Sequence, residues 1–179
     1  MLQYLRVVFD TINQKYTNLK ELLVQFAAYN LWANQQLTKL INSLDDALCN
    51  QEIISSFSSI KLTLNHLKVV EWIWWQRMKL VETIIVEEKE QTTEELSKEL
   101  LQYSQLWKEW VDKSTVAAFE HEFFYRNSKK EQFKQPVYQM LLHLFNHQTY
   151  HRGQLVTMLR QLGVNKIPAT DFIEWSRRK

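Results

Sequence analysis

The sequence of 179 residues predicts an all-α protein, an up-and-down type four-helix bundle with short extra elements. It contains two glycines and two prolines, whereas a β-protein with many turns needs turn residues every 8–12 positions or so. Long stretches instead place apolar residues at helical spacing. Hydrophobic residues make up 45% and charged residues 23% of the chain, a composition typical of a folded protein. Because this length suits one core, we assign residues 1–179 to a single domain.

The first two long helices are defined by their apolar spacing. The first is expected over about residues 17–44, and residues 45–55 are expected to form a loop. The second is expected from about Ser56 or Ser58, either of which is a good N-cap, to near Val81. We place its apolar face on a stripe that consists of Leu62, Val69, Ile73 and Leu80.

The last two long helices have recognisable ends. Thr92-Thr93-Glu94-Glu95 resembles a capping box and predicts the start of the third helix. The fourth is expected to open at Pro136 and to end at Gly163, which are favoured first and last positions. Between them, residues 121–135 are compatible with a short hairpin or an extended loop. Residues 171–179 are expected to form a short final helix, and residues 1–13 a further turn or two.

Composition also excludes several classes of function. The formal net charge is +2 and no basic stripe is present, which argues against nucleic-acid binding. Cys49 is the single cysteine, so we expect no internal disulfide, no thiolate cluster and an incidental thiol. No apolar run approaches the 18 or so residues that span a bilayer, and no signal peptide is recognisable. We therefore expect a soluble, cytoplasmic protein without a membrane partner.

Three of the five histidines follow one another at four-residue intervals on the predicted fourth helix: His143, His147 and His151. Residues four apart lie one turn above each other, so two adjacent imidazoles can bind one ion at about 2.0–2.1 Å. The outer two are about 12 Å apart at about 1.5 Å per residue, too far for all three to share that ion. His151 lies nearest the centre of the apolar face and His143 furthest from it, which favours the pair His147 and His151.

A third ligand must come from another helix. His66 lies in the predicted apolar stripe of the second helix. A single buried histidine is more often a hydrogen-bonded core residue, but one cation would satisfy three inward-facing imidazoles at once. His121 lies in the irregular segment and is expected at the surface.

The segment His147-x-x-x-His151-Arg152-Gly153-Gln154, preceded by Asn146, resembles the signature of the DinB/YfiT-like family. Weaker similarities occur in the expected order along nearly the whole chain: Tyr29–Asn34, Asn65-His66-Leu67 followed by Glu71 and Trp72, and Pro168-x-x-Asp171.

The resemblance implies a four-helix bundle whose metal is bound by His66, His147 and His151, in agreement with the helical wheel. It also implies a homodimer, since dimers are common in the family. Known members include thiol-dependent transferases and an isomerase, and many others are described as metal-dependent hydrolases. The family name refers to DNA-damage induction and implies no DNA contact.

Three histidines leave a coordination position open for water or substrate. We expect one divalent ion, zinc or nickel first and iron or manganese as alternatives. The leading hypothesis is a metal-dependent enzyme, a thiol S-transferase or a hydrolase, acting on a small molecule and using a low-molecular-weight thiol if it is a transferase. The alternatives are a non-catalytic metal- or ligand-binding bundle and a helical interaction protein whose histidines merely pack.

The roles of the surrounding residues stay open in the sequence. Glu71 is expected at the surface or hydrogen-bonded to a ligand, and Arg152 in a surface salt bridge or bound to an anionic substrate. Gly153 costs a helix about 1 kcal/mol relative to alanine, which suggests a close helix approach or mere tolerance. Further possible hydrogen-bond partners of the ligands are Gln154, Asn65 and Asp171. The tryptophans Trp72, Trp74 and Trp75 are expected in packing, a pocket or a dimer face.

Overall fold

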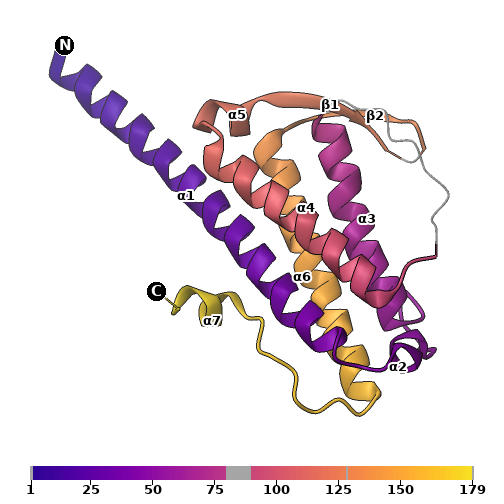
Figure 1. Ribbon diagram of the computed structural model, residues 1–179. Helices are drawn as coiled ribbons and strands as arrows, with labels where there is room; N and C mark the ends of the chain where they lie inside the picture. The colour runs from indigo at the N-terminus through magenta and orange to yellow at the C-terminus, as the bar shows by residue number, and fades with distance from the viewer. Residues whose placement is uncertain (1, 80–89, 128, 179) are drawn as a thin grey trace.

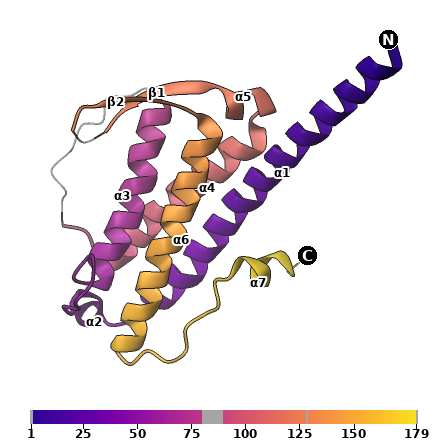
Figure 2. The ribbon, with the colours of Figure 1, turned by 180° about the vertical axis from the view of Figure 1, so that it is seen from behind.

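The computed structural model describes residues 2–79, 90–127 and 129–178, with side chains from residue 19 onward. Four long helices form the bundle: α1 (Leu2–Ile41), α3 (Ile60–Met78), α4 (Thr93–Lys113) and α6 (Val137–Gln161) (Figure 1). The predicted all-helical four-helix bundle is confirmed. Helix α1 begins well before residue 17 and extends beyond the other three, as Figure 2 shows.

Short elements connect or follow the long helices. Helix α2 (Asp46–Asn50) lies in the expected loop, and α5 (Val116–Glu120) precedes an antiparallel hairpin of β1 (Glu122–Arg126) and β2 (Gln132–Pro136). The hairpin pairs Phe124 with Lys134 and resolves the alternative left open for residues 121–135. The expected final helix is α7 (Phe172–Ser176). The acidic stretch near residues 87–90 lies almost wholly outside the described residues.

The helices do not simply alternate in direction around the bundle. Helix α1 packs against α4 and α6, and α3 packs against the same two, so α1 lies diagonally opposite α3. Helices α3 and α4 run parallel, since Lys68 lies beside Glu99 and Glu71, further along, beside Ser104. Direction therefore cannot be inferred from helix order.

The predicted helix ends are largely confirmed. The Ser59 hydroxyl caps α3 by accepting from the Leu62 amide at 3.1 Å, one residue beyond the expected cap. Helix α4 has the complete capping box, in which Glu95 also accepts from the Thr92 amide at 2.8 Å. Pro136 is the N-cap of α6 rather than its first residue. Gly163 follows α6 with φ +81°, a left-handed conformation that glycine adopts without strain.

The predicted core face of α3 is wrong. Leu62 is 48% exposed, Val69 and Ile73 are half-buried, and Leu80 lies outside the described residues. The buried apolar residues of α3 are Ile60, Leu64, Leu67 and Trp74. Helix α3 thus has two apolar faces, and periodicity does not tell which of them packs inward.

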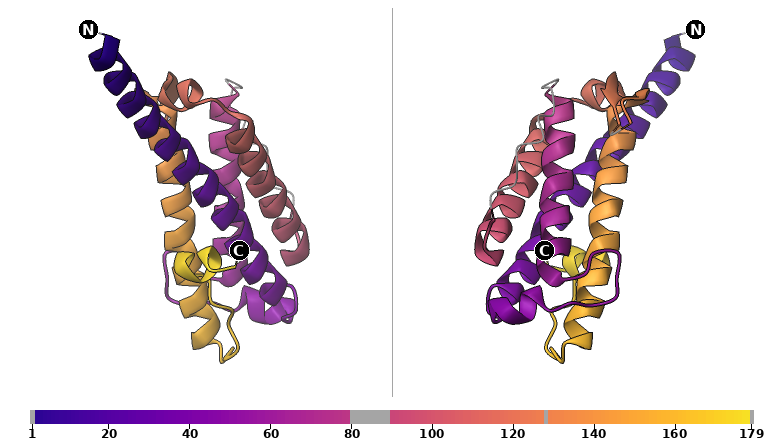
Figure 3. Two further views of the ribbon diagram at one scale, coloured as in Figure 1. Left: turned by 90° about the vertical axis from the view of Figure 1, so that its left-hand side faces the viewer. Right: turned by 90° about the vertical axis from the view of Figure 1, so that its right-hand side faces the viewer.

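The segment after α6 returns along the bundle and places α7 beside α1 (Figure 3). The Tyr29 hydroxyl donates to the Thr170 carbonyl at 2.7 Å, and Phe172 stacks on Phe26 with ring centroids 5.3 Å apart. These contacts fix the C-terminal segment against α1. Among the described residues, none of the helices combines the length and apolar character that a membrane span requires.

Candidate metal centre

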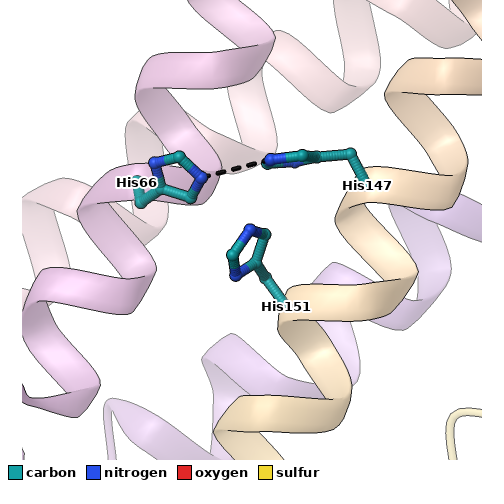
Figure 4. Close-up of side chains that lie close together, drawn as sticks. All are labelled: His66, His147 and His151. Atoms are coloured by element: carbon teal, nitrogen blue, oxygen red, sulfur yellow. Dashed lines mark hydrogen bonds between the residues drawn. The ribbon is translucent and has the colours of Figure 1, made fainter. Parts of the chain in front are cut away.

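Three histidines from two helices converge near the surface of the bundle. His66 projects from α3, and His147 and His151 project from successive turns of α6 (Figure 4). The Nε2 atoms of His66 and His147 are 3.2 Å apart. Each residue offers one ring nitrogen, and these nitrogens all lie within 4.8 Å of one another. The three residues predicted from the sequence are therefore brought together.

The spacing of the nitrogens fits a divalent cation. Two imidazoles bound to zinc at about 2.0–2.1 Å in tetrahedral geometry have nitrogens about 3.3 Å apart. The separation of 3.2 Å between His66 and His147, at which the two rings form a hydrogen bond (Figure 4), is close to that distance. Within the described part of the chain the cluster has three members, which is the ligand number of an open rather than a closed zinc site.

Burial keeps the imidazoles of His66 and His147 neutral. Desolvation first, and then the nearby His151, lower the pKa of His66 from 6.5 to about 4. The pKa of His147 falls to about 4 for the same two reasons, with smaller contributions from His66 and His143. A neutral imidazole is the form that binds a metal, so both rings have an available lone pair at neutral pH.

The orientation of His151 is set by Gln154, one of the residues expected beside the ligands. The Gln154 side-chain oxygen lies 2.6 Å from His151 Nδ1 and accepts a hydrogen bond from it, which keeps the proton on Nδ1 and leaves Nε2 unprotonated for a ligand. The amide group of Gln154 donates in turn to the Ser56 hydroxyl at 3.0 Å and to the Tyr150 hydroxyl at 3.3 Å. On the opposite side, Phe57 stacks on His66 with centroids 4.2 Å apart.

The other two described histidines stand apart. The ring of His143 packs against Trp74 at 5.5 Å and His147 at 5.8 Å, but it does not join the convergent set. His121 is exposed at the end of α5, as expected. Among the tryptophans, Trp74 lies in the core and Trp75 packs on it, so packing is confirmed for these two.

Glu71 is neither at the surface nor beside the ligands, contrary to the prediction. It is fully buried, and its carboxylate accepts from Asn30 Nδ2 at 2.8 Å and from the Ser104 hydroxyl at 2.8 Å and 2.9 Å. Burial raises the pKa of Glu71 to about 7, while the hydrogen bonds from Asn30 and Ser104 oppose that rise. The sequence did not reveal this because the wrong face of α3 was assigned to the core.

Arg152 is also buried, so the predicted surface salt bridge is wrong. Its Nη1 donates to Asn30 Oδ1 at 2.7 Å and to Asn34 Oδ1 at 3.0 Å, and the arginine is 2% exposed. The two asparagines thus bridge a buried cation and the buried carboxylate of Glu71. Sequence reasoning missed this network, although two asparagines four residues apart on an apolar helix face were a usable signal.

Gln148 is a second residue that the sequence analysis missed. It is fully buried, and its Nε2 donates to the Leu67 carbonyl at 2.9 Å. Because Gln148 follows His147 and Leu67 follows His66, this bond ties α3 to α6 at the level of the histidines.

Two further expectations are corrected. No atom lies within 4 Å of the position that a Gly153 side chain would occupy, so no close helix approach explains this glycine. Asp171 begins α7, where it shares a groove with Tyr29 and Arg152 rather than supporting the three histidines. The role of Asn65 stays a prediction.

The stability of the metal-free protein is expected to depend on pH in two opposing ways. The lowered pKa of His66 means that the unfolded chain binds the extra proton between pH 4 and 6.5, so stability rises with pH there. The raised pKa of Glu71 means that the folded chain holds the extra proton between pH 4.5 and 7, so stability falls with rising pH there.

Urea unfolding of the wild type, His66→Ala and Glu71→Gln in a chelator checks both signs. As the pH rises from 4 to 6.5, the unfolding free energy of the wild type should increase relative to that of His66→Ala. As the pH rises from 4.5 to 7, it should decrease relative to that of Glu71→Gln. Difference curves that stay flat over these ranges would contradict the assignments.

Comparison with known proteins agrees with this fold. The DinB family model matches residues 13–179. Protein DinB of Bacillus subtilis strain 168 is 31% identical over 154 residues, which cover 80% of this chain and 87% of that protein. A solved DinB-like protein from Bacillus subtilis has a TM-score of 0.63 at 14% identity over 82% of this chain and 97% of its own.

Another solved structure, YfiT from Bacillus subtilis, has a TM-score of 0.60 at 14% identity and covers 85% of this chain and 90% of its own. It is described as a probable metal-dependent hydrolase with an unusual four-helix bundle topology. The sequence match carries the assignment and the structural similarity supports the fold. The chain belongs to the DinB family.

Proposed function

We propose that His66, His147 and His151 bind one divalent metal ion and that the protein is a metal-dependent enzyme. The observation that carries this proposal is the convergence of three ring nitrogens from two helices, with the Nε2 atoms of His66 and His147 3.2 Å apart. The set consists of one buried and two half-buried imidazoles and includes no carboxylate. It is therefore a neutral site whose donor atoms are all nitrogens. Such a site favours zinc or nickel, with iron or manganese as alternatives.

Hydrolysis of a small molecule is the reaction that we favour. A divalent ion at such a site lowers the pKa of a water molecule to about 7, polarises a substrate oxygen or deprotonates a thiol. The description of YfiT as a probable metal-dependent hydrolase supports the first of these uses. In this chain Gln154 holds the proton on His151 Nδ1, and Phe57 covers the ring of His66 and restricts water on that side.

Thiol S-transfer is the second candidate reaction. Cys49 is the single cysteine of the chain and is fully buried in α2. Its pKa is raised, chiefly by burial, so it is a poor nucleophile. A transferase built on this site must therefore take its thiol from solution, as a low-molecular-weight co-substrate. The proposed homodimer rests on the family resemblance, and light scattering of the purified protein tests it.

Metal content tests the proposal most directly. Elemental mass spectrometry of the purified, untagged protein should find about one divalent ion per chain, and the His66→Ala variant should lose it. Absence of bound metal, even after reconstitution with zinc, nickel, iron or manganese, would overturn the proposal in favour of histidines that only pack. A loaded protein then justifies assays of ester and amide hydrolysis and of thiol transfer.

A further inference from the structure

A small pocket lies between the loop before α3 and the outer face of α6. Its volume is about 310 Å³, at the lower end of the range for ligand pockets, so it suits one chemical group rather than a whole ligand. Its lining carries no charge and combines the larger apolar or aromatic side chains Ile54, Tyr150 and Met158 with Gly153 and the polar Ser55, Gln154, Thr157 and Gln161.

The pocket shares a wall with the histidine centre. Gln154, which lines the pocket, holds His151 Nδ1 at 2.6 Å. Tyr150, on the pocket rim, has its ring 4.9 Å from the ring of His151. A molecule in this pocket would therefore lie on the Nδ1 side of His151, with Gln154 and the imidazole ring between it and the convergent nitrogens.

Gly153 keeps part of this pocket open. A side chain at this position would meet no atom within 4 Å, so packing inside the chain does not require glycine here. Gly153 lies in the middle of α6 and lines this pocket as well as the groove beside Tyr29 and Arg152, so a larger residue would narrow the space along this side of the helix that a ligand could use. Glycine is unfavourable in a helix, and packing within the chain does not require it here. Space for a ligand would explain why this position is a glycine.

Two large apolar side chains are left uncovered at the same place. Ile54 is 103% exposed and Tyr150 is 62% exposed. Single exposed apolar residues are ordinary, but these two flank one uncharged pocket beside the candidate metal centre. A bound apolar group would remove both from water.

We propose that this pocket binds a neutral alkyl or aryl group of the substrate, and that the reacting end of the substrate lies at His66, His147 and His151. The assignment of the reacting end rests on the proposed function. A charged group is disfavoured because the pocket offers no opposite charge to compensate for its lost hydration. The substrate is accordingly amphipathic, with an apolar part here and a metal-binding polar part at the histidines.

The probe is 1-hexanol, titrated into the metal-free full-length protein and followed through backbone amide NMR signals. Shifts should concentrate at Gly153 and Gln154. Hexanoate and hexylammonium should bind at least about tenfold more weakly. Ile54→Ser should weaken hexanol binding about three- to tenfold. The matched control, Ile173→Ser, also replaces an exposed isoleucine (58%) and should leave binding unchanged, because this residue lies on α7.

Gly153→Leu is the complementary variant. It should weaken hexanol binding and keep the melting temperature and metal content of the wild type, since leucine favours a helix and its Cβ meets no atom within 4 Å. Shifts confined to other residues, equal weakening by Ile54→Ser and Ile173→Ser, or hexanoate binding as tight as hexanol would overturn the pocket assignment. Metal binding without hexanol binding would overturn the pocket alone. Hexanol binding without metal binding would overturn the proposed function and leave the pocket as a ligand site.

Discussion

Replacing His147 or His151 by alanine is expected to abolish stoichiometric metal binding while the bundle stays folded. Each variant removes one of three nitrogen ligands, and the remaining two cannot hold a divalent ion at micromolar concentration as three do. The fold should survive because the helix contacts near these residues are carried by others, such as the bond from Gln148 to Leu67. Elemental analysis after dialysis, together with circular dichroism, measures both parts.

His143→Ala is the matched control for these two variants. It removes an imidazole that lies on the same helix, one turn before His147, but outside the convergent set. It should therefore keep about one ion per chain. Full metal occupancy in both His147→Ala and His151→Ala, or equal loss in His143→Ala, would show that the three-histidine assignment is wrong.

The Arg152→Leu substitution is expected to lower the free energy of unfolding by about 3–5 kcal/mol, the usual cost of removing one partner from a buried charge pair. Leucine leaves the Oδ1 atoms of Asn30 and Asn34 without their donor. It also removes the positive charge of Arg152, which lowers the pKa of the fully buried Glu71. Urea unfolding at neutral pH, read by circular dichroism, measures the change.

Two further variants distinguish the loss of the buried hydrogen-bond network from a general loss of packing. Arg160→Leu, at an exposed position on the same helix, should change stability by less than about 0.5 kcal/mol. Glu71→Gln in the Arg152→Leu background should restore part of the loss, because it removes the uncompensated carboxylate, and a coupling of about 0.5–3 kcal/mol is expected. If Arg152→Leu and Arg160→Leu are equally mild, the buried network does not stabilise the bundle.

The parts of the fold that depend on residues close together along the chain were predictable from the sequence. The capping box at Thr92, the glycine after α6 and the hairpin alternative all rest on interactions within a few positions along the chain. The candidate ligands were predictable for a related reason. Four-residue spacing alone places His147 and His151 on one face of a helix, and the family resemblance adds His66.

The relative placement of the helices was not predictable in this way. The apolar stripe chosen on α3 points outward around Leu62, and Glu71 was consequently misplaced at the surface. The parallel course of α3 and α4 likewise does not follow from their order along the chain. Periodicity reports the face of one helix, whereas packing depends on which faces of several helices fit together.

The sequence by itself determined the helical class, the start of α4, the ends of α6 to within a residue and the identity of the three histidines as candidates. Only the tertiary structure decided that His66 and His147 approach to 3.2 Å, and that Asn30 and Asn34 join Arg152 to Glu71 inside the bundle. The physical reason is that helix formation and capping arise from contacts a few residues apart. These site contacts instead join residues 37 to 122 positions apart, and they exist only after the helices have packed.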